Sequence, residues 1–167
     1  MRSSTRWPVF LGVTFASAYS LYYVATATRW HFIDYADLIF HEAGHVLFMF
    51  FGEFLHALMG SGLQILLPLC ISLYFFYHRQ IISGAICLMW TGMNFINVSL
   101  YAGDALTLQL PLLGGDNVRH DWNYLLSALN MLHLAPVVAS TLFSLGCVVI
   151  AAGIILAYKF TVFGKRG

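Results

Sequence analysis

Long apolar runs separated by short polar stretches dominate the pattern of this chain. The runs cover about residues 8–27, 33–59, 63–77, 81–101 and, from Leu134 or Pro136, the stretch to residue 158. The polar stretches Gly60–Gly62 and His78–Gln80 are expected to be turns. A helix needs ~20 apolar residues to cross a bilayer. The pattern therefore predicts an all-α fold, a polytopic transmembrane helical bundle of about five spans that forms one integral membrane domain over residues 1–167.

The segment 102–122 departs from this pattern because it carries Asp104, Asp116 and Asp121 together with a proline and several glycines. It is too polar to face lipid unsupported and too apolar in its middle for a plain solvent loop. We expect a re-entrant segment that is buried in protein at membrane depth or lines a wet cavity. The following residues, 121–133, predict an amphipathic helix with Asp121 as its N-cap.

Composition supports a membrane protein and excludes a nucleic-acid-binding one. Hydrophobic residues make up 60% of the chain and charged residues only 9%, and the mean hydropathy is +0.78; a soluble domain carries about 25% charged residues. The eight Lys and Arg residues lie singly or in pairs, as at span ends, rather than on one basic face. We expect a multi-pass protein of a cell or inner membrane, surrounded by lipid.

The motif HEAGH, residues 41–45, places three titratable side chains inside the second apolar run. On a helix, His41 and His45 share one face and lie ~6 Å apart along the axis, which makes a two-nitrogen clamp for a metal ion. Glu42, rotated by ~100°, can serve as general base for a water molecule. Asp37, one turn before His41, could orient that imidazole. A charge in hydrocarbon costs at least ~2.5 kcal/mol, so the cluster indicates a site, for which we expect one Zn²⁺ ion.

Catalytic zinc usually has three protein ligands, so a third residue is required. His56 would lie ~16 Å beyond His45 along an unbroken helix, which rules it out unless the chain breaks at Gly52. The remaining candidates are Asp104, Asp116, His120 and Asp121.

Two segments resemble the site-2 protease family of intramembrane zinc metalloproteases: FHEAGH, Phe40–His45, and NVSLYAGDA, Asn97–Ala105. The second match lacks the prolines of the family and has Gly103 before the Asp rather than a glycine after it. The resemblance implies that His41, His45 and Asp104 bind zinc and that Glu42 activates water. It also implies that Asn97 holds the backbone of a transmembrane or juxtamembrane peptide substrate.

Asp104 lies near the end of the fourth apolar run, whereas the histidines lie toward the opposite end of the second. One hypothesis is that the fourth helix unwinds around Asn94–Asn97, so that Asp104 folds back. The other is that the re-entrant segment delivers His120, alone or with Asp104. Asp104 ranks first and His120 second; Asn94, Asp116 and Asp121 are candidates for substrate binding or for supporting the ligands. We expect Gln64 to connect helices.

These features together predict a membrane-embedded zinc-dependent hydrolase, first of all an intramembrane metallopeptidase. A metal-dependent lipid amidase or esterase is the alternative within the same chemistry, because activated water attacks any carbonyl presented to it. A non-enzymatic metal-binding or ion-translocating membrane protein is the alternative outside it. Glu42 separates these classes, since hydrolysis needs its carboxylate and metal binding does not.

Overall fold

The computed structural model describes residues 7–110 and 119–162, and within them the chain is helical, without strands. The helices are α1 (Trp7–Ala25), α2 (Phe32–Phe48), α3 (Glu53–Tyr77), α4 (Ile81–Gly103), α5 (Asp121–Ala128) and α6 (Ala135–Val162). Two short 3₁₀ helices, Met49–Phe51 and Leu132–Leu134, precede α3 and α6. The all-α helical bundle predicted from the sequence is confirmed.

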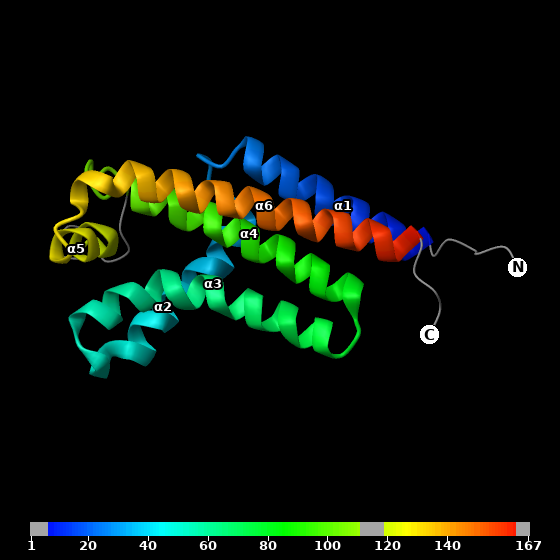
Figure 1. Ribbon diagram of the computed structural model, residues 1–167, viewed down its shortest axis with the longest axis horizontal. Coiled ribbons are helices and arrows are strands. Elements are labelled where there is room, and N and C mark those ends of the chain that lie inside the picture. The colour runs from blue at the N-terminus through cyan, green and yellow to red at the C-terminus, as the bar shows by residue number, and fades with distance from the viewer. Residues whose placement is uncertain (1–6, 111–118, 163–167) are drawn as a thin grey trace, which may run out of the picture.

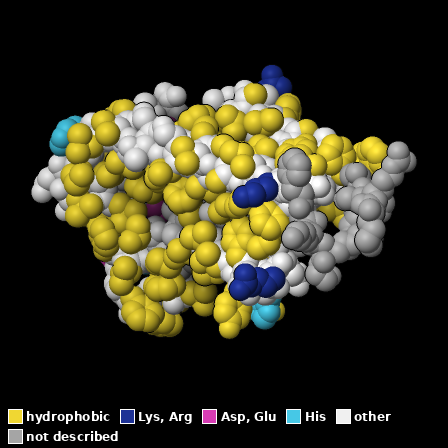
Figure 2. Space-filling model, turned by 45° about the vertical axis from the view of Figure 1, so that its right-hand side comes forward, with side chains coloured by type: hydrophobic (Ala, Val, Ile, Leu, Met, Phe, Trp, Pro, Cys, Tyr) yellow, Lys and Arg dark blue, Asp and Glu magenta, His cyan; other side chains and the backbone are white. Residues whose placement is uncertain are grey.

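Four helical segments of the described chain are long and apolar enough to cross a membrane: α1, α3, α4 and residues 132–162, which include α6. Helix α2 has 17 residues and is not one of them, so the structure has one candidate span fewer than the sequence predicts. Large apolar side chains cover the outside of the molecule, and Phe15 and Tyr77 are 75% and 83% exposed (Figure 2). Such a surface is compatible with a multi-pass membrane protein.

Helices α1, α4 and α6 lie side by side along the length of the molecule (Figure 1). The contact between α4 and α6 is the most extensive of all, and glycines bring the two backbones together there. A Cβ atom added at Gly92 would lie 2.7 Å from the carbonyl oxygen of Gly146, and one added at Gly146 would lie 2.7 Å from that of Gly92. Small residues at such contacts are typical of helices that pack in a membrane.

The chain breaks at Gly52, between α2 and α3. Gly52 has φ +91° and ψ 160°, a backbone conformation open almost only to glycine. The predicted second span to Met59 and the predicted turn at Gly60–Gly62 are therefore wrong, because these residues lie inside α3. The sequence signal was ambiguous: small residues in an apolar run mark a turn in one setting and a close helix contact in another. The other predicted turn, His78–Gln80, is confirmed between α3 and α4.

Helix α5 lies at one end of the molecule and packs against α3 and the end of α4 (Figure 1). It is shorter than the predicted helix over 121–133: it ends at Ala128, and Asn130 follows with φ 57°. Its N-cap is His120, whereas Asp121, the predicted cap, is its first residue. Residues 111–118, and with them Asp116 and the middle of the predicted re-entrant segment 102–122, lie outside the described residues.

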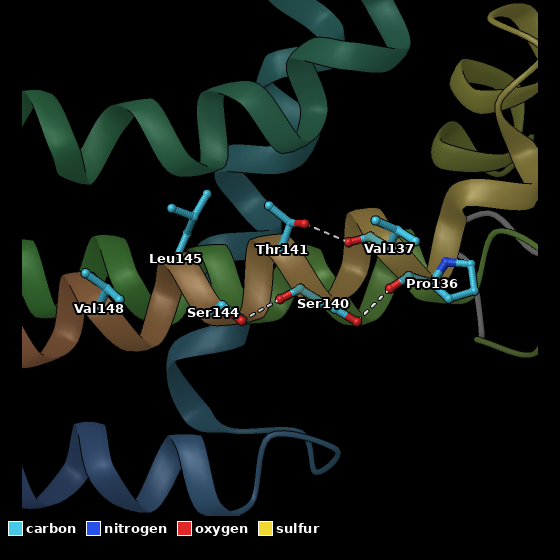
Figure 3. Close-up of a pocket in the computed structure, with 7 residues that line it drawn as sticks. All are labelled: Pro136, Val137, Ser140, Thr141, Ser144, Leu145 and Val148. Carbon is cyan, nitrogen blue, oxygen red and sulfur yellow. Dashed lines mark hydrogen bonds between the residues drawn. The ribbon is translucent and has the colours of Figure 1, made fainter.

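A shallow pocket of about 560 Å³ lies on the surface of α6 (Figure 3). Its lining residues all come from that helix: Pro136, Val137, Ser140, Thr141, Ser144, Leu145 and Val148. The three hydroxyl groups each donate to the carbonyl four residues earlier in α6, at 2.7–2.8 Å. Because no titratable group lines this pocket and its hydroxyls are already bonded to the backbone, chemistry must be sought elsewhere.

Candidate metal site

The two motif histidines on α2 and the first residue of α5 meet between the two helices. The Nε2 atom of His41 lies 3.1 Å from Oδ2 of Asp121, and Nε2 of His45 lies 3.2 Å from the same oxygen. Ligand atoms of the three residues all lie within 4.8 Å of one another. This His-His-Asp group is the one set of residues in the described chain with the geometry to hold a metal ion.

Two glycines make room for this group. At Gly44, on α2, an added Cβ atom would collide with the backbone carbonyl of Met59, so α3 packs directly against the helix there. At Gly60, on α3, an added Cβ atom would lie 2.5 Å from Nε2 of His45 and 2.8 Å from Nε2 of His41. The imidazoles of the motif therefore occupy space that any larger residue at position 60 would fill.

Hydrogen bonds to Nδ1 fix the orientation of both rings. Nδ1 of His41 lies 3.2 Å from Oε1 of Gln64, and Nδ1 of His45 lies 2.8 Å from the backbone carbonyl oxygen of His56. These oxygens only accept, so each Nδ1 carries a hydrogen and donates it. Nε2 is then the ring atom left to bind a metal in both histidines, the arrangement common for histidine ligands.

Asp121 offers an ionised carboxylate to the two rings although its side chain is buried. Burial by itself would raise the pKa of Asp121, but the hydrogen bonds from His41 and His45 outweigh it and lower the pKa to about 2. The hydroxyl of Tyr101 also donates to Oδ2 of Asp121, at 3.3 Å. A metal ligand must be deprotonated, so this carboxylate is in the state that binding needs.

Asp104 and His120, the two residues ranked first as third ligand, contact each other and do not join the His-His-Asp group. Nε2 of His120 lies 3.4 Å from Oδ2 of Asp104, and Nδ1 of His120 accepts from the backbone N–H of Asn123, which caps α5. The carboxylate of Asp104 also accepts from the backbone N–H groups of Gln109 and Leu110. The pair thus holds the start of α5, and so Asp121, in place.

Helix α4 is continuous from Ile81 to Gly103, so the hypothesis that it unwinds around Asn94–Asn97 is wrong. The third group comes from the chain after residue 118, but it is Asp121 and not His120, so the second hypothesis is wrong about the residue delivered.

The predicted supporting residues have other partners than the sequence suggested. Asp37 does not orient His41: its Oδ1 accepts from Nε1 of Trp90 at 2.8 Å. Asn94 donates to the backbone oxygen of Trp90 and is fully buried. Asn97 accepts from Gln64 and donates to Asp34, at 2.9 and 3.1 Å, so both ends of its amide are engaged within the protein. That leaves Asn97 poorly suited to hold a substrate backbone.

A cavity of about 1160 Å³ opens onto the histidines and Asp121. Glu42 is exposed and lines it, next to His41. Leu38, Leu100 and Leu110 provide apolar walls, and at an outer part Arg119 pairs with Glu53 at 3.2 Å. The general base that the motif predicts and the candidate metal ligands therefore face one common space, large enough for a segment of a peptide or lipid.

The sequence places Asp121 among four candidates for the third group but does not single it out. Two features of the site were not predicted: Gly60 as the residue that leaves space, and the backbone of His56 as a partner of His45. The condition for the last was recognised, since a break at Gly52 is what brings His56 back to His45. Comparisons of the chain with protein-family models, curated proteins and solved structures gave no match. The fold and the site together define a helical bundle of membrane type with a candidate His-His-Asp metal centre facing a large cavity.

Proposed function

We propose that this chain is an integral membrane, zinc-dependent hydrolase, and that its reaction is the cleavage of a peptide bond within or next to the membrane. The observation that carries the proposal is the convergence of His41, His45 and Asp121 beside a cavity that Glu42 also lines. The resemblance of FHEAGH to the intramembrane metalloproteases points to the same chemistry.

The ligand set suits zinc. Two imidazole nitrogens and one carboxylate oxygen match the three protein ligands of a hydrolytic zinc site, with the fourth position left open. Zinc bound there would supply a Lewis acid that polarises the scissile carbonyl and acidifies water. The bonds from Nδ1 of both histidines to fixed oxygens and the hydrogen bond from Tyr101 to Asp121 hold the three ligands in the required orientation.

Glu42 has the role of general base in this proposal. It takes the proton from the attacking water and passes it to the leaving group, an exchange that contributes about 10²–10⁴-fold to a hydrolysis rate. Its place supports that role, because it follows His41 directly and faces the cavity rather than the helix packing.

A lipid amide or ester is the second candidate substrate. The cavity is lined by leucines and tyrosines as well as by the polar site, so an acyl chain would find apolar contacts beside the candidate metal ligands. The chemical step is the same for both substrate classes, and the activity assay must offer both.

The test combines metal content with activity. The protein is purified in detergent without chelators, and zinc is counted by elemental analysis in the wild type and in His41→Ala, Asp121→Ala and Glu42→Gln. We expect about one zinc per chain in the wild type and Glu42→Gln, and a loss of zinc in the other two. Absence of zinc from the wild type after loading with excess metal overturns the proposal.

Activity is then measured with labelled transmembrane peptides and with acyl amides and esters in mixed micelles. We expect Glu42→Gln to lower the rate by about 10²–10⁴-fold while zinc is retained. Equal rates in the wild type and Glu42→Gln, or no turnover of any substrate by the zinc-loaded wild type, would indicate the non-enzymatic metal-binding class instead.

A further inference from the structure

A row of buried and part-buried hydrogen bonds leads from the candidate metal ligand His41 into the helical bundle. Nδ1 of His41 donates to Oε1 of Gln64, Nε2 of Gln64 donates to Oδ1 of Asn97, and Nδ2 of Asn97 donates to Oδ1 of Asp34, at 3.2, 2.9 and 3.1 Å. The four side chains come from α2, α3, α4 and again α2. Gln64 and Asp34 are only 3% and 2% exposed, so little water competes for these bonds.

Asp34 is the fixed end of this chain of bonds. Its Oδ1 also accepts from the hydroxyl of Tyr23 at 2.6 Å, and its Oδ2 accepts from the backbone N–H of His31 at 2.7 Å. The carboxylate is therefore tied both to α1 and to the first turn of its own helix. Tyr23, the backbone N–H of His31 and Asn97 all donate to it, so the Asp34 carboxylate is the acceptor in each of these bonds.

Because Asp34 accepts, it decides which group donates and which accepts in each of the other bonds of the row. Asn97 must turn its NH₂ group to Asp34, because its carbonyl oxygen would otherwise face a carboxylate oxygen. Its oxygen is then left for the NH₂ group of Gln64, and the oxygen of Gln64 is left for His41. With an acceptor opposite Nδ1, His41 keeps a hydrogen on Nδ1 and donates it to Gln64. Its Nε2 lies 3.1 Å from the Asp121 carboxylate, which is also an acceptor, so Nε2 donates there in the metal-free protein and is the atom whose hydrogen a metal ion would replace.

We propose that Gln64, Asn97 and Asp34 are positioning residues that keep a hydrogen on Nδ1 of His41, so that Nε2 is the atom that binds the metal. This inference rests on the proposed function for the identity of the metal, but the hydrogen on Nδ1 belongs to the metal-free protein. It gives Asn97 and Gln64 a different role from those expected of them, substrate binding and the connection of helices.

A connection between helices alone would not need this order of donors and acceptors. Ser72 lies on α3, as Gln64 does, and makes a bond of this simpler kind. Its hydroxyl donates to the backbone oxygen of Gly84 at 2.8 Å, which joins α3 to α4 without contact to the site. Ser72→Ala is therefore the matched control for Gln64 variants, because it removes a buried bond from α3 and leaves His41 untouched.

The first measurement uses the metal-free full chain labelled with ¹⁵N-histidine in detergent micelles. The nitrogen shifts report which ring atoms carry a hydrogen. We expect Nδ1 of His41 to carry a hydrogen in the wild type, in Ser72→Ala and in Gln64→Glu, which keeps an acceptor. We expect Nδ1 to lose its hydrogen in Gln64→Leu, because Asp121 is then the remaining acceptor and holds the hydrogen on Nε2. A wild-type ring without a hydrogen on Nδ1, or an unchanged ring in Gln64→Leu, overturns the inference.

The second measurement titrates the same variants with Co²⁺, a probe whose visible absorption reports on its ligands. Loss of a residue that orients a metal ligand typically weakens binding by 10–100-fold. We expect that loss in Gln64→Leu with an altered spectrum, a smaller loss in Asn97→Ala and Asp34→Asn, and wild-type binding in Ser72→Ala. Equal affinities in Gln64→Leu and Ser72→Ala contradict the positioning role.

The two measurements separate this inference from the proposed function. If the hydrogen on Nδ1 of His41 behaves as expected but the wild type takes up no Co²⁺ or Zn²⁺, the metal site and the hydrolase proposal fail while the orientation of His41 stands. If the wild type binds metal and Gln64→Leu binds it equally well with the same spectrum, the positioning role fails while the proposed function stands.

Discussion

Gly60 in α3 and Gly92 in α4 both lie where a Cβ atom would have no room, but what fills the room differs. Opposite Gly92 lie the backbone carbonyl of Gly146 and both the main chain and the side chain of Ile150. Opposite Gly60 lie the imidazole nitrogens of His41 and His45. The first contact lets two apolar helices pack closely, and the second gives two polar rings a place inside a bundle that is otherwise apolar.

One sequence signal, a glycine inside an apolar run, therefore serves two purposes that only the opposite surface distinguishes. Damage at a packing contact should appear as lost stability with a normal site. Damage at the site contact should appear as lost metal binding in a chain that still folds, because side-chain tips can move where backbone cannot. Substitution of single glycines tests this distinction directly.

The largest effect is expected for Gly60→Ala. The added methyl group would overlap the Nε2 atoms of both histidines and push the rings away from Asp121, so we expect zinc content to fall from about one ion to near zero. Elemental analysis of the purified variant measures it. Gly12→Ala is the matched control, since a Cβ atom there meets nothing within 4 Å. Wild-type zinc content in Gly60→Ala would contradict the geometry of the site.

Gly92→Ala should act in the opposite way, on stability alone. The methyl group would lie 2.6 Å from a side-chain carbon of Ile150 and 2.7 Å from the carbonyl oxygen of Gly146, and overpacking of this kind costs about 3 kcal/mol at its upper range. Reversible unfolding in mixed micelles measures the loss. The folded fraction should still bind zinc with wild-type affinity. A lower zinc affinity in Gly92→Ala would show that the α4–α6 contact and the metal site depend on each other.

Much of the fold follows from the sequence because it depends on local pattern. The runs at residues 8–27 and 81–101 became α1 and α4 with small shifts at their ends, and the His78–Gln80 turn forms as expected. The predicted second span, residues 33–59, is wrong because of two glycines. Gly52 was expected within this span but separates α2 from α3, and Gly60 was expected in a turn but lies within α3. Only the position of α2 against α3 decides between the two.

The site residues also divide into those that the sequence predicts and those that only the folded chain brings together. His41, Glu42 and His45 could be predicted because their spacing on one helix fixes their geometry. Asp121 could not be singled out from Asp104 and His120, since a contact across 80 positions between His41 and Asp121 depends on how α5 docks. The pairing of Asp104 with His120, which removes both from the list of ligands, is likewise a property of the folded chain.

Gly52→Ala should give an intermediate result that links both kinds of damage. Its φ of +91° and ψ of 160° are strained for any residue with a Cβ atom, which costs about 2 kcal/mol. Relief of the strain would also move the backbone of His56 away from Nδ1 of His45. We expect lower stability in mixed micelles together with weaker Co²⁺ binding, and Gly12→Ala again serves as control. Reduced stability with unchanged Co²⁺ affinity would show that His45 does not depend on this break.

Gly103→Ala is expected to have the smallest effect, and it tests whether the α4–α6 contact is graded along its length. Gly103 is the last residue of α4, and a Cβ atom there would lie 3.3 Å from the methyl group of Ala139, with no backbone atom of α6 nearby. A side chain can yield by a few tenths of an ångström, and alanine favours the helix over glycine. The two contributions oppose each other, so we expect a change in the free energy of unfolding within about 0.5 kcal/mol. A loss as large as that of Gly92→Ala would mean that α4 and α6 are equally close throughout.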